Sequence, residues 1–171
     1  NQIAYADPGF FRLFDFELLK GDKKTCLSMP RQVVITERIA SKYFKDEDPI
    51  GKIFIFTGAY DKISCEVTGV MKEMPSNSHI HYSFLISYKS LPKYMQEYWY
   101  KHEAYTYVLL DSPERKAEIE REFPVMAEKY KTEEALKNKT WGVDLVPLAD
   151  IHLTPQLGYE METKGNRSAM I

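Results

Sequence analysis

The sequence lacks most of the features that would identify a function directly. No run approaches the roughly 18–20 apolar residues needed to cross a bilayer, and the longest apolar stretches, such as residues 107–110, have the length of a strand. The 8 glycines are dispersed, so the glycine loops that bind dinucleotides or phosphates are absent. Positive charge is not in excess, since 23 Lys and Arg face 25 Asp and Glu, and the densest basic stretch, residues 20–24, contains Gly21 and Asp22. This argues against nucleic acid or an anionic membrane surface as a partner.

Cysteine is scarce as well, with only Cys26 and Cys65. A chain of this length buries about two-thirds of the surface that its unfolded form exposes, so it needs neither a disulfide nor a metal to fold. Cys65 alternates with Val67 along an apparent strand, which is typical of a small buried residue. A disulfide in an oxidising compartment stays an open alternative, because two cysteines alone do not predict one.

The residues that are present describe an ordinary globular domain. Hydrophobic side chains make up 44% of the sequence, charged ones 28% and aromatic ones 13%, and this aromatic content argues against disorder. The chain begins without Met, in a strand-like segment at residues 2–5, and residues 1–9 do not resemble a signal peptide. We therefore interpret it as a piece of a longer polypeptide, whose location the missing membrane signals do not reveal.

The spacing of apolar residues predicts short strands that alternate with helices. Strands are expected at residues 2–5, 33–35, 52–56, 64–71, 82–88, 104–110, 144–148 and 151–153, where β-branched residues or period-two alternation occur. In the fourth of these, Cys65, Val67 and Met71 are expected to face the core, while Val70 lies on the opposite face. The predicted class is α+β, or mixed α/β, with helices on one face of mostly antiparallel sheets.

Capping residues place the helices between these strands. Asp7 and Pro8 are expected to start a helix that carries Phe10, Phe11 and Phe14, and Thr36 is expected to cap the helix that begins at Glu37. A short helix is expected within residues 91–100. Ser112 and Pro113 begin a long helix that continues to Tyr130, and Pro124 predicts a kink within it. The helix that begins at Glu37 is expected to bury one stripe, formed by Ile39, Ala40, Tyr43 and Phe44. In the last helix, helical spacing continues on both sides of Pro124 through Ile119, Phe123, Met126, Ala127 and Tyr130.

The histidines and serines are the candidates for chemistry. His79 and His81 would face one side of a strand and could bind a metal, but a third ligand would have to come from His152 or a distant carboxylate. Ser76 and Ser78 lie near His79, yet no nucleophile elbow surrounds them, and the segment is typical of a turn. The sequence therefore predicts no catalytic residue, no metal site and no cofactor.

Two further segments could mediate interactions. Residues 113–122 are highly charged, and pairs such as Lys116 with Glu120 and Arg115 with Glu118 have the spacing of neighbours on a solvated helix face. An aromatic cluster could pack in the core or form an exposed binding patch. Its members are Tyr94, Tyr98, Trp99, Tyr100, Tyr105 and Tyr107.

An ordered set of segments resembles a known family. The segments are ADPGFF at residues 6–11, FDF at 14–16, LLKGD at 18–22, VVITE at 33–37, ASKYF at 40–44, DPIGK at 48–52, VTGVM at 67–71, PSNSHI at 75–80 and LADIHL at 148–153. Together they resemble the MacB-like periplasmic core domain of ABC-transporter permeases of the MacB/FtsX type, in its Bacteroidetes-like version. The resemblance covers nearly the whole chain, and it carries no binding-site motif that could be transferred residue by residue.

The resemblance implies a domain between the first two of four membrane helices, on the periplasmic side of a bacterial inner membrane. Residues 1–171 would form one periplasmic core fragment with two lobes: a βαβ-containing, membrane-proximal lobe built from both chain ends, and an inserted β-rich lobe. The implied partners are an ABC ATPase, fused or separate, a second permease copy, and a periplasmic partner or exported substrate. The implied role is mechanotransmission without catalysis. A ligand-binding sensor domain of a membrane receptor is the alternative, and a metal-dependent hydrolase built around His79 and His81 is a third.

Overall fold

The computed structural model describes residues 2–58, 62–97, 104–130 and 137–153. The chain divides into two compact units, Asn1–Glu97 and Tyr98–Ile171. None of the helices in the described ranges combines the length and hydropathy that a membrane span requires.

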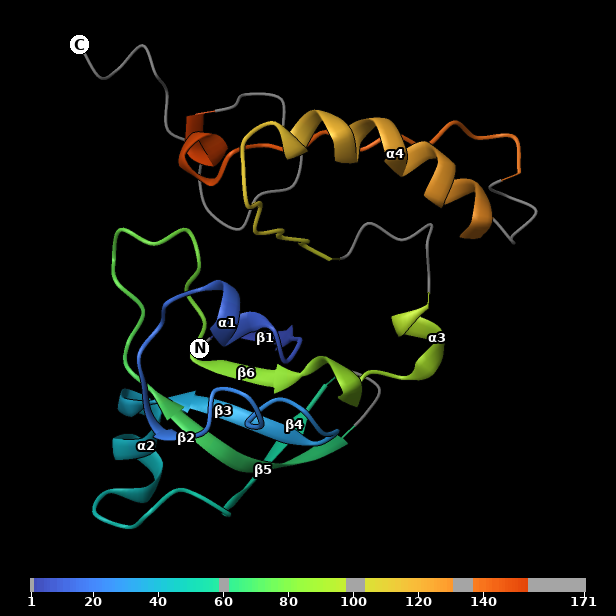
Figure 1. Ribbon diagram of the computed structural model, residues 1–171. Coiled ribbons are helices and arrows are strands. Elements are labelled where there is room, and N and C mark those ends of the chain that lie inside the picture. Colours follow the sequence, from blue (N-terminus) through green and yellow to red (C-terminus); the bar gives the residue numbers. More distant parts are fainter. Residues whose placement is uncertain (1, 59–61, 98–103, 131–136, 154–171) are drawn as a thin grey trace. The chain divides into compact units, whose positions relative to one another are not determined.

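The first unit is built on a six-stranded mixed sheet (Figure 1). Its strands are β1 (Ile3–Ala6), β2 (Leu18–Gly21), β3 (Gln32–Thr36), β4 (Ile53–Thr57), β5 (Lys62–Met71) and β6 (Phe84–Ser87). The order is β1-β6-β3-β5-β2, and β4 pairs with the first half of β5. The β1–β6 and β3–β5 pairs are parallel and the other three are antiparallel, so the expectation of mostly antiparallel pairing is confirmed.

Short helices connect these strands. The first unit contains α1 (Phe10–Leu13), α2 (Glu37–Phe44), the 3₁₀-helix η1 (Tyr88–Ser90) and α3 (Lys93–Gln96). In the second unit, α4 (Arg115–Tyr130) and the 3₁₀-helix η3 (Leu148–Leu153) are described. Because β3 and β5 are parallel neighbours, the chain must cross over between them, and α2 lies in that connection. This is the predicted βαβ arrangement, with β4 added before the second strand.

Helix α2 covers the principal core on one face of the sheet. There Ile39 of the helix packs with a buried cluster from three strands, and Phe44 packs against it. The cluster consists of Val33, Ile35, Cys65, Val67, Val70, Phe84 and Ile86. The ring of Phe54 contacts those of Phe44 and Phe84 edge to face, with ring centroids 5.4 Å apart in both pairs. This geometry is favourable for aromatic pairs.

The segment between β2 and β3 provides further buried residues. Cys26 and Leu27 are almost inaccessible to solvent. Their carbonyl groups accept hydrogen bonds from Thr68 Oγ1 at 2.6 Å and from Ser87 Oγ at 2.9 Å, respectively. The segment is therefore fixed to β5 and β6 by polar contacts as well as by packing.

Two bulges interrupt the pairing of β5 with β3 and with the segment that leads into β4. Opposite β3 the register moves from Val33↔Val67 to Val34↔Gly69, so Thr68 is an extra residue. As a result Val70 lies in the same buried cluster as Cys65 and Val67, and Met71 is buried as well. The strict alternation predicted for residues 65–71 is therefore wrong. Opposite Val67, Gly51 has a φ of +80°. Its amide donates to the Val67 carbonyl, and the Val67 amide donates to Lys52, which is the pattern of a G1 bulge.

Thr36 caps α2 as predicted. It is fully buried, and its Oγ1 accepts the amide hydrogen of Ile39 at 3.4 Å.

We expect Thr36→Ala to lower the free energy of unfolding by about 0.5–2 kcal/mol, because an amide of the first turn loses its acceptor. Thr36→Ser keeps this acceptor and should recover most of the loss in urea denaturation. Equal losses in the two variants would show that packing of the threonine methyl group, and not the cap, is what matters.

Several predicted elements differ from the structure. Helix α1 begins only at Phe10, because Asp7 accepts the Gly9 amide at 2.6 Å in a local turn that precedes the helix. The strand β2 was not predicted. The strands predicted at residues 104–110 and 144–148 are wrong, since no partner strand in the described part of the second unit pairs with them, and residues 151–153 belong to η3. The long helix α4 is confirmed and continues through Pro124.

Candidate functional site

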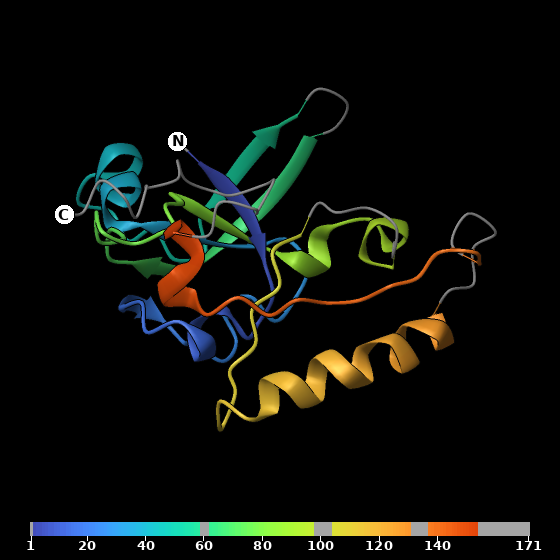
Figure 2. The ribbon, with the colours of Figure 1, turned by 90° about the horizontal axis from the view of Figure 1, so that it is seen from above.

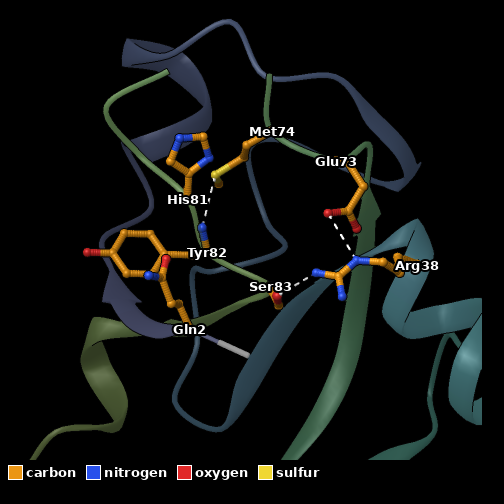
Figure 3. Close-up of a pocket in the computed structure, with 7 residues that line it drawn as sticks. All are labelled: Gln2, Arg38, Glu73, Met74, His81, Tyr82 and Ser83. Carbon is orange, nitrogen blue, oxygen red and sulfur yellow. Dashed lines mark hydrogen bonds and ion pairs between the residues drawn. The ribbon is translucent and has the colours of Figure 1, made fainter. Parts of the chain in front are cut away.

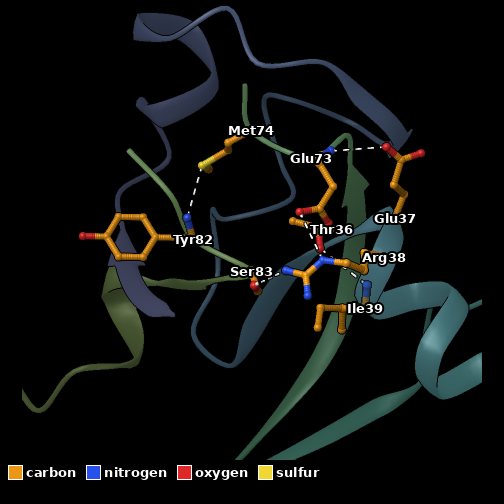
Figure 4. Close-up of polar contacts among 8 residues, drawn as sticks. All are labelled: Thr36, Glu37, Arg38, Ile39, Glu73, Met74, Tyr82 and Ser83. Carbon is orange, nitrogen blue, oxygen red and sulfur yellow. Dashed lines mark hydrogen bonds and ion pairs between the residues drawn. The ribbon is translucent and has the colours of Figure 1, made fainter. Parts of the chain in front are cut away.

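A polar network connects the start of α2 to the loop after β5 and the segment before β6 (Figure 4). Arg38, in the first turn of α2, donates through Nη2 to Ser83 Oγ at 3.2 Å, and its Nε lies 3.4 Å from Glu73 Oε2. The neighbouring Glu37 accepts the backbone amide of Glu73 through Oε1 at 3.3 Å. The cap at Thr36 orients this first turn, so the helix start positions both charged side chains toward the loop after β5.

The network borders a small pocket of about 260 Å³ (Figure 3). Its lining residues are Gln2, Arg38, Glu73, Met74, His81, Tyr82 and Ser83. The Tyr82 amide donates to the sulfur of Met74 at 3.3 Å, which holds two lining segments together. Ligand sites for small molecules usually measure about 300–1,000 Å³ and are mostly apolar. This pocket is smaller and its lining is polar.

The chemistry available at this pocket is limited. The positive charge of Arg38 is compensated by Glu73, and both side chains are about half exposed, so their ion pair stabilises the fold by at most about 1 kcal/mol. The buried Ser83 hydroxyl accepts a hydrogen bond from a guanidinium, which withdraws electron density and does not activate a nucleophile. The arrangement therefore supports a structural or weak polar-binding role.

The predicted histidine pair is not part of a strand. His79 and His81 precede β6, which begins at Phe84, so the same-face argument does not apply to them. The ring of His79 lies 6.3 Å from that of Phe14, whereas His81 lines the pocket. His152 lies in η3, and its side chain is outside the described part. Within the described ranges, no three His, Cys, Asp or Glu residues gather as a metal site would require.

The serine segment is a turn, as predicted. The Ser78 amide donates to the Pro75 carbonyl at 2.9 Å, and Ser78 Oγ accepts the Ile80 amide at 3.1 Å. Ser76 is exposed in the same turn. These hydrogen bonds use Ser78 to shape the loop before β6.

Both cysteines are free and buried. Burial raises the pKa of the Cys26 thiol from 9.0 to about 11, with a smaller contribution from the charge of Asp22. Burial also raises the pKa of Cys65. Since the folded pKa of Cys26 is higher than the unfolded one, the stability gained from keeping this thiol neutral is complete below pH 9 and is lost as the pH rises toward 11.

We expect both thiols to resist modification in the folded protein. At pH 8, reaction with an aromatic disulfide reagent should be at least about 100-fold slower than in denaturant, because burial blocks access and suppresses the thiolate. Absorbance of the released thiolate measures this rate. Rapid native reaction of one equivalent would contradict the burial of that cysteine.

The structure describes part of the predicted aromatic cluster and the charged segment at residues 113–122. Tyr94, in the first unit, and Tyr105, in the second, are exposed, and Tyr107 is half-buried. Tyr98, Trp99 and Tyr100 lie outside the described residues. In α4, Arg115 contacts Glu118 at 2.9 Å and Lys116 contacts Glu120 at 3.1 Å. The prediction of ion pairs along a helix face is thus confirmed.

Apart from His81, the pocket residues could not be found from the sequence. Arg38 and Ser83 are 45 positions apart, and only the sheet brings them together. No motif surrounds Arg38, Glu73 or Ser83. The one local signal was Thr36 as a cap followed by Glu37, which located the helix start but not its contacts.

Comparisons with known proteins place this fold. The family of MacB-like periplasmic core domains matches residues 1–124. A domain of a protein named as a permease, from Porphyromonas gingivalis, aligns with a TM-score of 0.62 and 20% sequence identity, over 78% of this chain and 61% of that chain. The periplasmic region of MacB from Actinobacillus actinomycetemcomitans aligns with a TM-score of 0.39 and 19% identity, over 52% of this chain and 38% of that chain. A search of curated proteins finds no match.

The mixed sheet with α2 on one face forms an α+β fold similar to that of the permease domain. The chain spans 61% of the length of that solved domain. The family match covers most of the chain. This chain belongs to the family of MacB-like periplasmic core domains, which are domains of ABC-transporter permeases and not a class of enzymes.

Proposed function

We propose that this domain transmits movement in an ABC-transporter permease, coupling ATP hydrolysis on the cytoplasmic side to export of a substrate or actuation of a partner in the periplasm. The observation that carries the proposal is the family match over residues 1–124. The parent would be a bacterial inner-membrane protein. Its partners would be an ABC ATPase, a second permease copy, and a periplasmic protein or exported substrate.

The packing of the first unit supports a mechanical role. A lever must move as one body, and here buried residues from three strands and α2 form one continuous cluster. Interiors packed in this way have low compressibility and transmit strain. We propose that the membrane-proximal lobe contains this sheet together with the C-terminal part of the chain, as the family resemblance implies.

A ligand-sensing domain is the second candidate, and the pocket at Arg38 is the observation in its favour. A sensor would bind a small polar molecule there and pass the signal to its own membrane segments. The small volume and the compensated charge of Arg38 count against this candidate.

Labelling of α2 in the membrane-embedded permease tests the proposal. Ser41 is exposed on α2, so a spin label at Ser41→Cys should not disturb the core, while the buried Cys26 and Cys65 should stay unlabelled. We expect the distance between labels on two permease copies to change by several ångströms between the nucleotide-free and ATP-bound states. Electron paramagnetic resonance measures this distance.

The same labels on the detached domain, with ATP added, provide the control and should show no change. Distances in the intact permease that do not respond to nucleotide would contradict mechanotransmission. If those distances responded to a small molecule and also required Arg38, the sensor would be favoured instead.

A further inference from the structure

The outer edge of β4 is unprotected. Among the described residues, β4 pairs with β5 and with no other strand, and the two form a hairpin that extends beyond the rest of the sheet (Figure 2). The strand β4 itself, Ile-Phe-Ile-Phe-Thr, contains no charge and no proline, and the bulge at Gly51–Lys52 lies before its first residue. Native edge strands usually carry one of these features, because an open edge can pair with another chain.

Apolar residues occupy both faces of β4. Phe54 and Phe56 are partly buried and pack against Phe84 on the face that α2 covers. On the opposite face, Ile53 and Ile55 are 58% and 65% exposed. Exposed isoleucines on an edge strand are a recognised basis for association with another strand.

The hydrogen-bond pattern identifies which residues point their backbone outward. Val67 exchanges backbone hydrogen bonds with the Gly51–Lys52 bulge. Along an antiparallel ladder, hydrogen-bonded and non-hydrogen-bonded residue pairs alternate, so the next pair, Ile53 with Glu66, is not hydrogen-bonded. Phe54 and Phe56 therefore face β5. The amide and carbonyl groups of Ile53, Ile55 and Thr57 point to the outer edge.

We propose that β4 pairs antiparallel with β4 of a second copy of this chain, about a two-fold axis that passes beside Ile55. In this register Ile55 lies opposite Ile55, and Ile53 of each copy lies opposite Thr57 of the other. All outward-facing backbone groups of the strand are then bonded. Four isoleucines line one face of the joined sheet, and Phe54 of each copy lies beside Phe56 of the other on the opposite face.

Charge complementarity favours a second copy over an unrelated strand. On the isoleucine face, β5 places Glu66 beside Ile53 and Lys62 beside Thr57. Antiparallel pairing puts Glu66 of one copy in the same row as Lys62 of the other, with their backbones about 14 Å apart, so a weak attraction favours this orientation, whereas parallel pairing would align like charges. A two-fold interface uses the same edge on both copies, so it closes without forming a filament.

This pairing rests on the proposed function, because it assigns the contact surface for the second permease copy named there. The two fail separately. Crosslinks at β4 test the pairing, whereas the nucleotide dependence of distances at Ser41 tests mechanotransmission. A pairing that persists without nucleotide-dependent movement would contradict only the function.

Register-specific disulfide formation tests the pairing. In a bonded antiparallel pair the Cα atoms are about 5.5 Å apart, within the range that a disulfide spans. Ile55→Cys should therefore crosslink to itself, both in the purified chain and in membranes that contain the parent permease. Ile53→Cys alone should form at least about tenfold less dimer, because the two substituted positions would be about 14 Å apart along the strands. A mixture of Ile53→Cys and Thr57→Cys chains should crosslink as a heterodimer.

The outcomes separate the alternatives. Absence of the Ile55→Cys dimer in both preparations overturns the proposal, as does equal self-crosslinking at positions 53, 55 and 57, which would indicate parallel pairing or random collision.

Ile55→Lys provides a second measurement, since Ile55 is too exposed for this change to unfold the domain. Sedimentation should show that Ile55→Lys weakens self-association at least about tenfold, because two lysines would oppose each other at the axis. Unchanged association in this variant also overturns the proposal.

Discussion

Replacing Ile35 by alanine is expected to lower the free energy of unfolding by about 2–5 kcal/mol, one of the two largest effects that we predict. Ile35 is completely buried in β3, within the cluster that joins α2 to the sheet. Its register partners are Val70 of β5 and Phe84 of β6, which are themselves fixed in ladders. The surrounding structure can therefore relax little around the missing methyl groups, and a cavity should remain.

Chemical denaturation monitored by circular dichroism measures this loss at low micromolar protein concentration. Ile55→Ala is the matched control, because it removes the same atoms from a strand residue that is 65% exposed. It should change the stability of the monomer by less than about 0.5 kcal/mol. Similar losses at both positions would mean that the cluster around Ile35 is not tightly packed.

The unit from β3 to α2 could be predicted because several local signals agree there. A β-branched run, Val33-Val34-Ile35, precedes Thr36 as a capping residue, and an apolar stripe follows in α2. Each of these preferences acts within a few residues, so the sequence specifies the element without knowledge of the rest of the fold. The structure confirms both elements and the cap.

Elements that depend on distant partners could not be predicted. Residues 18–21 form β2 only because Gly21 and Lys20 pair with the end of β5, far later in the chain. The bulge at Thr68 likewise depends on its contacts with Cys26 and Val33, so periodicity alone placed Val70 on the wrong face. Conversely, residues 104–110 have the composition of a strand, yet they form no strand in the described structure.

The candidate site shows the same difference between local signals, which the sequence reveals, and contacts between distant segments, which it does not. Sequence patterns singled out His79, His81 and Ser78. Of these, His79 lies beside the ring of Phe14, Ser78 shapes the loop before β6, and His81 lines the pocket. The network at Arg38 lacked any motif, since its members come from a helix start and the segments beside two strands. The permease assignment came from the order of many short segments, none of which carries chemistry of its own.

Gly21→Ala is expected to be the second severe change, with a loss of about 3 kcal/mol or more, because a strained backbone and a steric clash add together. Gly21 has a φ of +96°, a conformation that costs a residue with a side chain about 1–3 kcal/mol. An added Cβ would also lie 2.4 Å from the carbonyl oxygen of Thr68 and 3.0 Å from the Cα of Gly69. Both are backbone atoms of β5, held by the ladder and by the Thr68 bulge, so neither can move aside without breaking the pairing of β2.

Gly51→Ala separates the two contributions. Gly51 also has a positive φ, at +80°, but an added Cβ there would meet no atom within 4 Å. This variant should lose only the conformational term, about 1–2 kcal/mol, and the difference between the two variants measures the steric cost at β2. Urea denaturation of both proteins gives the comparison. Equal losses would mean that β2 can separate from β5 at little cost, and that its pairing contributes little to the stability of the sheet.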